Sequence, residues 1–86
     1  MLRVTVASTG KVADLKIEGS IANPDARELW RECRRQKDSG RRLRLDISGV
    51  TQADEMSIKR LKRLMRGGAE VVGASLFLSA LLEDEP

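Results

Sequence analysis

The sequence predicts a two-layer α/β fold: a four-stranded mixed sheet in the order 1-2-3-4, its first strand antiparallel, with three helices on one face. Segments with a polar and apolar period of two alternate along the chain with segments whose apolar residues recur at i, i+3 and i+4. The first three strand-like segments each keep a polar face, which a sheet covered on both sides would not show. Right-handed crossovers that place every helix on the same side then give the order 1-2-3-4.

Residues 2–6 and 13–18 predict the first two strands, because apolar side chains occupy every second position in both. Turn-forming residues at 8–11 separate them, which favours an antiparallel hairpin. We expect Gly19 and Ser20 to end the second strand. The apolar faces of this hairpin consist of Leu2, Val4, Val6, Ala13, Leu15 and Ile17.

The first helix is predicted to start at Asn23, Pro24 and Asp25, with Asn23 as the capping residue. A Gly-containing turn at 38–40 ends it. Trp30 is its largest expected core anchor. The stripe expected to be buried comprises Ala26, Leu29, Trp30 and Cys33, at i, i+3, i+4 and i+7.

A third strand is predicted next, because Leu43, Leu45 and Ile47 share one face and polar residues the other. Residues 48–53 are expected to form the loop into the second helix, and Asp54 is the predicted cap of that helix. The second helix is expected to bury Ile58, Leu61, Leu64 and Met65 and to end at Gly67 and Gly68.

Residues 70–74 predict a short fourth strand, and Ser75 is the expected cap of a third helix. Residues 83–86 form an acidic tail that we expect to fray. No repeat or linker interrupts the pattern, so residues 1–86 are interpreted as one domain. The face of the third helix expected to pack on the core comprises Leu76, Phe77, Ala80 and Leu81.

The composition favours a cytoplasmic domain that does not insert into a membrane. Cys33 is the one cysteine, so the chain suits a reducing compartment. Residues 1–6 alternate polar and apolar side chains, which indicates a strand and not a signal peptide. The longest apolar run, 76–82, is far short of the roughly 20 residues that span a bilayer. A net charge of +3 permits nucleic acid, anionic membrane or an acidic protein as a partner.

The residue types present do not predict an enzyme, a metal site or a cofactor. The sequence contains no His and no Tyr, so a Ser or Cys nucleophile lacks the usual imidazole base. One Cys without His does not make a zinc site. The glycines match neither a dinucleotide fingerprint nor a P-loop. Residues 48–53 precede a helix start that would suit a phosphate, but Asp54 and Glu55 already occupy that positive end.

The second helix carries a basic stripe that either meets an anionic partner or is a solvated helix face. Arg60 lies beside it. Nucleic acid is the weaker interpretation, because Trp30 and Phe77 are the only aromatic residues and both lie on apolar stripes. A strand also separates the first two helices, which excludes a helix-turn-helix. The basic stripe consists of Lys59, Lys62, Arg63 and Arg66, at i, i+3, i+4 and i+7.

One segment resembles a known family. The run Leu45-Asp46-Ile47-Ser48-Gly49-Val50-Thr51, followed after two residues by Asp54, resembles the D-L-S-G-V-T-x-x-D segment of STAS domains. These domains occur in anti-sigma-factor antagonists and sulfate transporters. The order of predicted elements resembles the STAS core along nearly the whole chain. The resemblance implies a STAS-like fold and a non-enzymatic protein-interaction module with a protein partner, such as an anti-sigma kinase or another signalling protein.

The resemblance also implies a departure at the regulatory position. In anti-sigma-factor antagonists the segment continues with D-S-S-G-L, and the second Ser is phosphorylated by the partner kinase. Met56 stands at that position here, and Ser57 stands where the family has Gly. We therefore expect a minimal module that ends after its third helix and is not switched by phosphorylation, with Ser57 phosphorylation and the oligomeric state left open. The implied interface is Gly49, Thr51, Asp54, Glu55, Met56 and Ser57.

Overall fold

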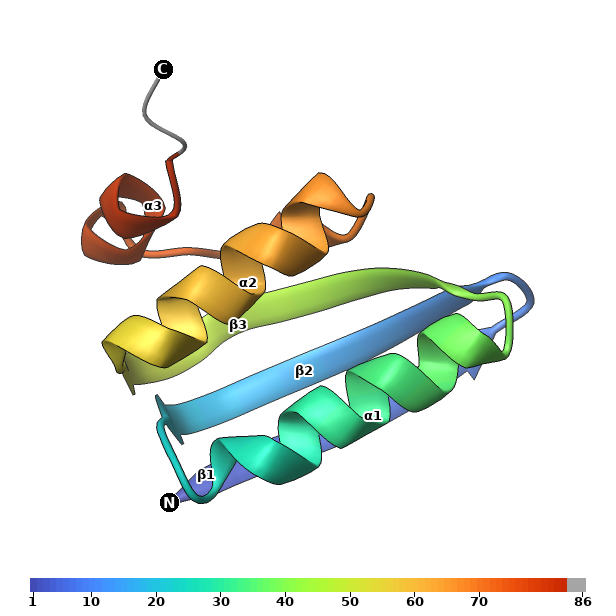
Figure 1. The fold of residues 1–86 in the computed structure, drawn as a ribbon, viewed down its shortest axis with the longest axis horizontal. Helices are drawn as coiled ribbons and strands as arrows, with labels where there is room; N and C mark the ends of the chain where they lie inside the picture. The colour runs from blue at the N-terminus through green and yellow to red at the C-terminus, as the bar shows by residue number, and fades with distance from the viewer. Residues whose placement is uncertain (84–86) are drawn as a thin grey trace.

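A computed structural model of the protein describes residues 1–83 and contains one four-stranded sheet (Figure 1). Its strands lie in the order β1-β2-β3-β4; β1 is antiparallel to β2, and the other neighbouring pairs are parallel. The predicted mixed sheet and its order are therefore confirmed. The strands are β1 (Leu2–Thr9), β2 (Val12–Ile21), β3 (Arg42–Ala53) and β4 (Glu70–Val72).

Three helices complete the fold, as predicted: α1 (Ala26–Asp38), α2 (Glu55–Arg66) and α3 (Leu76–Leu82). Figure 1 shows α1 and α2 running side by side over the same face of the sheet, with α3 beside α2 on the side away from α1. The α2 helix thus has a neighbouring helix on each flank.

The core lies between the sheet and the helices. Alternate residues of the two central strands, such as Leu15 in β2 and Leu45 in β3, are fully buried under Leu29 of α1 and Leu61 of α2. The opposite sheet face is polar, as the alternation predicts. The whole apolar core consists of Ala13, Leu15, Ile17, Ile21, Ala26, Leu29, Cys33, Leu43, Leu45, Ile47, Val50, Ile58, Leu61, Leu78 and Leu82.

The edge strand β1 is less covered than its alternation predicts. Leu2 and Val4 are partly buried against the core, but Val6 is 37% exposed. The expectation that all three share a buried face is wrong for Val6. Because β1 is the outermost strand, the end of it that carries Val6 receives little cover from the helical layer.

Residues 48–53 are part of strand β3, so the prediction of a loop there is wrong. The second strand likewise continues past Gly19 and ends at Ile21. Gly49 pairs with Glu18 after one register irregularity, and Ala53 pairs with Ile21 after a second; each gives β3 an extra residue relative to β2. The pairing satisfies backbone groups that a loop would leave to water.

The turn before α1 does not form the predicted cap. The helix begins at Ala26, and its N-cap residue Asp25 makes no side-chain capping hydrogen bond. The backbone N–H of Asn23 donates instead to Oδ2 of Asp54, at 3.3 Å. Asn23 therefore connects the start of α1 with the start of α2.

The predicted ends of α2 are confirmed. Asp54 is the N-cap, and its Oδ1 accepts a hydrogen bond from the Ser57 backbone N–H at 2.8 Å. At the other end Gly68 has a φ of +104°, which lets the backbone N–H of Ala69 donate to the Leu64 carbonyl at 3.0 Å. Of its predicted apolar stripe, Ile58 and Leu61 are buried, Leu64 is half-buried, and Met65 is 37% exposed, so the last is not a core residue.

The predicted face of α3 is wrong, although its cap is right. Ser75 Oγ accepts from the Leu78 backbone N–H at 3.1 Å. The residues that pack inward are Leu78 and Leu82, while Leu76 is 92% and Phe77 71% exposed. Ala80 and Leu81, the other members of the predicted face, are exposed as well. The predicted acidic tail lies outside the described residues from position 84 onward.

A polar cluster at the C-terminal half of α1 was not predicted. Gln36 is buried, and its Oε1 accepts hydrogen bonds from Ser8 Oγ at 3.2 Å and from Arg41 Nη1 at 3.3 Å. Its Nε2 donates to Glu32 Oε2 at 2.7 Å. That bond, with smaller contributions from Arg35, holds the pKa of Glu32 below its usual value. The cluster joins the β1–β2 hairpin to α1.

Candidate functional site

The predicted interface residues lie where β3 meets α2, but they differ in exposure. Gly49 and Thr51 belong to β3, and only Thr51 is well exposed. In the first turn of α2, Glu55 is exposed and Met56 is 63% exposed. Ser57 is only 2% exposed. The surface that a partner can reach therefore consists of Thr51, Glu55 and Met56, with Asp54 at its edge.

Asp54 and Ser57 position the start of α2. The hydroxyl and the backbone N–H of Ser57 both hydrogen-bond the Asp54 carboxylate, and these bonds hold the pKa of Asp54 below its usual value. The Asn23 backbone N–H adds a weaker bond to the same carboxylate. Both side chains are thus engaged within the protein.

Gly49 has a packing role. A Cβ at this position would lie 2.8 Å from Cγ of Glu18 on the neighbouring strand, so a larger residue would displace that side chain. A glycine here permits the close approach of β2 to the irregular part of β3.

Met56 also faces the hollow between the N-terminal halves of α1 and α2. Its neighbours around that hollow include Pro24 and Arg27, from the α1 turn and helix, and Arg60 on α2. The hollow has a volume of about 420 Å³. The predicted interface therefore continues into the space between the two helices.

The basic stripe does not form one surface. Arg63 faces α1 and lines the groove between the helices. Lys59 forms an exposed ion pair with Glu55 at 3.6 Å, of the i,i+4 type. Lys62 is half-buried, and neither it nor Arg66 lines that groove. Arg60, which the sequence placed beside the stripe, lies in the groove with Arg63.

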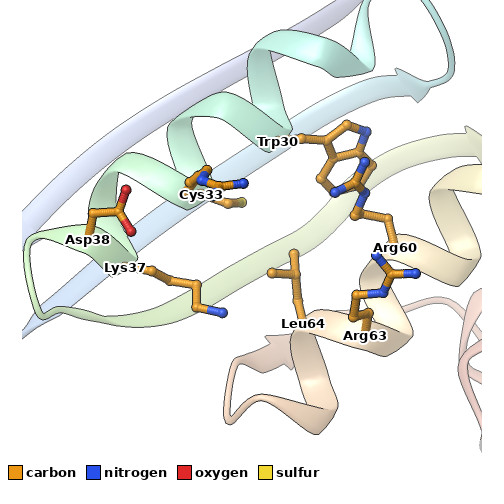
Figure 2. A pocket seen from close by; sticks show the side chains of 8 residues that line it. Trp30, Cys33, Lys37, Asp38, Arg60, Arg63 and Leu64 are labelled. Atoms are coloured by element: carbon orange, nitrogen blue, oxygen red, sulfur yellow. The ribbon is translucent and has the colours of Figure 1, made fainter.

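The α1–α2 groove is a strongly charged concave feature of the described residues. Figure 2 shows Trp30 and Lys37 extending from α1, and Arg60, Arg63 and Leu64 from α2, into the space between the helices. The groove has a volume of about 360 Å³. Its lining comprises Trp30, Cys33, Arg34, Lys37, Asp38, Arg60, Arg63 and Leu64.

Trp30 lies in the wall of this groove. The expectation that it is the main core anchor of α1 is wrong, because its side chain is only partly buried. The guanidinium carbon of Arg60 lies 5.7 Å from the centre of the Trp30 ring, which is within cation–π range. This contact joins the two helices across the groove.

Cys33 contributes an inert surface to the groove floor. It is 1% exposed, and burial raises the pKa of its thiol to about 12, with a smaller contribution from Glu32. The thiol therefore stays protonated near neutral pH and behaves as a small apolar side chain. This agrees with its predicted core role.

The groove was missed at the sequence level, although α1 carries a signal for it. Arg27, Trp30, Arg34 and Lys37 recur at i, i+3, i+7 and i+10, which places them on one helix face beside the buried stripe. Trp30 was expected in the buried stripe of this helix, and a groove between this face and α2 was not predicted.

Residues 1–83 contain no cluster of three or more His, Cys, Asp or Glu side chains placed to hold a metal ion. Among the helices of the described residues, none is both long enough and apolar enough to cross a membrane.

In comparisons with known proteins, no protein-family model matches the chain. No curated protein sequence matches it either.

Proposed function

We propose that the protein is a non-enzymatic interaction module of STAS type that docks a cytoplasmic protein partner, such as an anti-sigma kinase, at the start of α2. The observation that carries the proposal is the exposure of Met56, 63%, on the first turn of a well-capped helix. An exposed Met offers a flexible apolar contact that adapts to the surface of a partner. Thr51 and Glu55 beside it supply a polar rim, as protein interfaces commonly have.

The rigidity of this helix start supports the proposal. Asp54 accepts hydrogen bonds from Ser57 and from Asn23, so the backbone that carries Met56 is fixed from two sides. A surface that is already ordered loses less conformational entropy when it binds. The first turn of α2 is therefore suited to docking without rearrangement.

Site-specific photo-crosslinking in the native host tests the docking site. A photo-reactive phenylalanine analogue replaces Met56 in one variant and Thr5, exposed on β1, in the control. We expect one discrete protein adduct from position 56 that is absent from position 5 and is lost when Glu55→Lys is added. No adduct at position 56, or the same adducts from both positions, would remove the support for this docking site.

We further propose that Ser57 is not a phosphorylation switch. Its side chain is 2% exposed and hydrogen-bonds Asp54, so a kinase reaches the hydroxyl only if the first turn of α2 opens. Incubation with ATP and any kinase encoded beside the gene, followed by peptide mass spectrometry, should find no stoichiometric phosphate at Ser57. Ser57→Ala is the control. Full phosphorylation with loss of the position-56 adduct would overturn the non-switching proposal.

Nucleic-acid binding through the basic stripe remains the second candidate but has less support. Lys59 is paired with Glu55, and Arg63 lines the groove, whereas Lys62 and Arg66 do not. A phosphate backbone would therefore not meet four neighbouring cations on one convex helix face. The cations that do converge are those of the groove.

A further inference from the structure

We infer that the α1–α2 groove binds an acidic peptide segment that carries an apolar side chain. This is a second binding surface. It meets the docking site at the hollow that Met56, Trp30 and Arg60 line, but the inference stands on the groove alone. The inference depends on three properties of the groove: its charge, its apolar floor and its length.

The charged side chains of the groove are mainly positive. Arg34 and Lys37 on α1 and Arg60 and Arg63 on α2 line the groove, and Asp38 is the one carboxylate among the described lining residues. Among residues 1–83, none of these four cations takes part in a salt bridge. Four cations with a single carboxylate among them repel one another, and an anionic ligand between the helices relieves that repulsion.

The floor of the groove adds an apolar component. Cys33 and Leu64 lie between the cations, and the partly exposed ring of Trp30 forms the wall at one end. A free inorganic anion would leave this apolar surface hydrated. A peptide that places carboxylates on the walls and an aliphatic side chain on the floor satisfies both kinds of contact.

The groove continues along both helices. Trp30 and Arg60 also line the hollow next to Met56, and Lys37 and Leu64 also line a third hollow next to Gly67 and Gly68. The 13-residue helix α1 is about 20 Å long at 1.5 Å per residue. An extended peptide of about six residues covers that length.

A peptide fits this groove better than nucleic acid. Trp30 is the only Trp of the chain, the one Phe lies in α3 away from the groove, and one face of the Trp30 ring is occupied by Arg60. Single-stranded nucleic acids are held by successive bases stacked on aromatic side chains, and the groove offers no such series. Duplex DNA would contact the rims and leave the apolar floor unused.

The test uses the whole purified protein and a synthetic peptide of about eight residues with several Glu side chains and a central Leu. Because Trp30 is the only Trp, its fluorescence reports binding in the groove directly. We expect the peptide to cause a saturable change in Trp30 emission. The affinity derived from this change should fall as the salt concentration rises. The peptide with Gln in place of Glu should not bind, and the peptide with Ser in place of Leu should bind less tightly.

Matched variants separate the groove from general charge. Arg60→Gln with Arg63→Gln removes two groove cations, and Arg31→Gln with Lys59→Gln removes two from the same helices outside the groove. Anisotropy of a labelled peptide should show affinity about tenfold or more weaker for the first pair and changed less than about twofold for the second. The pair Arg34→Gln with Lys37→Gln, on the opposite wall, should match the first.

Three results would overturn the inference. They are no binding at low salt, equal losses in the groove and control pairs, and tighter binding of a single-stranded oligonucleotide of equal charge than of the peptide. Far-UV circular dichroism and urea midpoints verify that every variant is folded. Because no cellular partner is involved, the outcome is independent of the crosslinking test at position 56.

Discussion

The two flanks of α2 differ in the side chains that line the space between α2 and the neighbouring helix. On the flank toward α3, the hollow between the helices is lined mainly by apolar side chains, among them Met65, Val71 and Leu82. On the flank toward α1, the described side chains of the walls include four cations and a single carboxylate. The same helix therefore has one flank suited to burial and one suited to an anionic ligand.

This difference shows how a small domain divides one helix between folding and binding. Apolar side chains stabilise a contact by leaving water, so those of the α3 flank favour the packing of α3 beside α2. Cations of like sign cannot close a contact in this way, so the α1 flank stays open and is connected by Trp30 with Arg60 and by Asn23 with Asp54. Three changes break or sharpen this comparison.

The largest effect is expected on the apolar flank. Leu78 in α3 is 3% exposed, so Leu78→Ala removes buried methyl groups and should lower the free energy of unfolding by about 2 to 4 kcal/mol. Leu76→Ala in the same helix is the control, because Leu76 is 92% exposed, and it should change stability by less than about 0.5 kcal/mol. Urea denaturation measures both. If Leu76→Ala cost more than Leu78→Ala, the inward face of α3 would be the one predicted from the sequence.

The sequence predicted α2 well and the face of α3 badly for a physical reason. In α2, charged residues alternate with apolar ones, so the period defines which side is buried, and Asp54 marks the start. In α3, the seven residues from Leu76 to Leu82 contain only Ser79 as a polar side chain. When a helix has no polar face, its sequence does not indicate which side is buried. Tertiary packing then determines which of its leucines face the core.

The sheet order was predictable because the first three strands kept their alternation, whereas residues 48–53 were not assigned to β3. Gly49 and Ser48 are typical turn residues, and their pairing requires irregularities that shift the register against β2.

The groove could not be predicted from one helix, because side chains of both α1 and α2 form it. The spacing of α1 alone predicts Trp30 as a core residue, and its contact with Arg60 depends on how α2 packs beside α1. Local sequence patterns predict the helices and strands, whereas the groove depends on contacts between helices.

A smaller effect is expected where hydrogen bonds tie the α1 flank. Ser57 lowers the folded-state pKa of Asp54, so the carboxylate stabilises the fold above its unfolded pKa, about 3.9, and this contribution is lost as pH falls through the folded value. Asp54→Asn should therefore be less stable than the wild type at about pH 7, and the gap should shrink toward about pH 3. Urea midpoints across this range measure it.

Glu55→Gln is the control for this prediction, because Glu55 is exposed and its ion pair with Lys59 contributes little. It should stay close to the wild type throughout. A gap for Asp54→Asn that widens in acid would mean that the carboxylate does not hold the start of α2.

The smallest effect concerns the repulsion across the groove, and a double-mutant cycle isolates it. Arg34 on α1 and Arg63 on α2 line the same groove, so the gain in stability from Arg63→Gln should be about 0.5 kcal/mol larger when Arg34 is present than in Arg34→Gln. The cycle cancels what each Arg contributes within its own helix, such as Arg63 in the last turn of α2.

The same cycle between Arg31 and Arg63 is the control, since Arg31 does not line the groove, and its coupling should be near zero. Salt supplies the second control. The Debye length is about 30 Å in 10 mM salt and about 3 Å in 1 M salt, so the Arg34–Arg63 coupling should be present in the first and absent in the second. A coupling that persists in 1 M salt would arise from packing between the walls. In that case the α1 flank would be held by contact, as the α3 flank is, and the groove cations would not be poised for an anionic ligand.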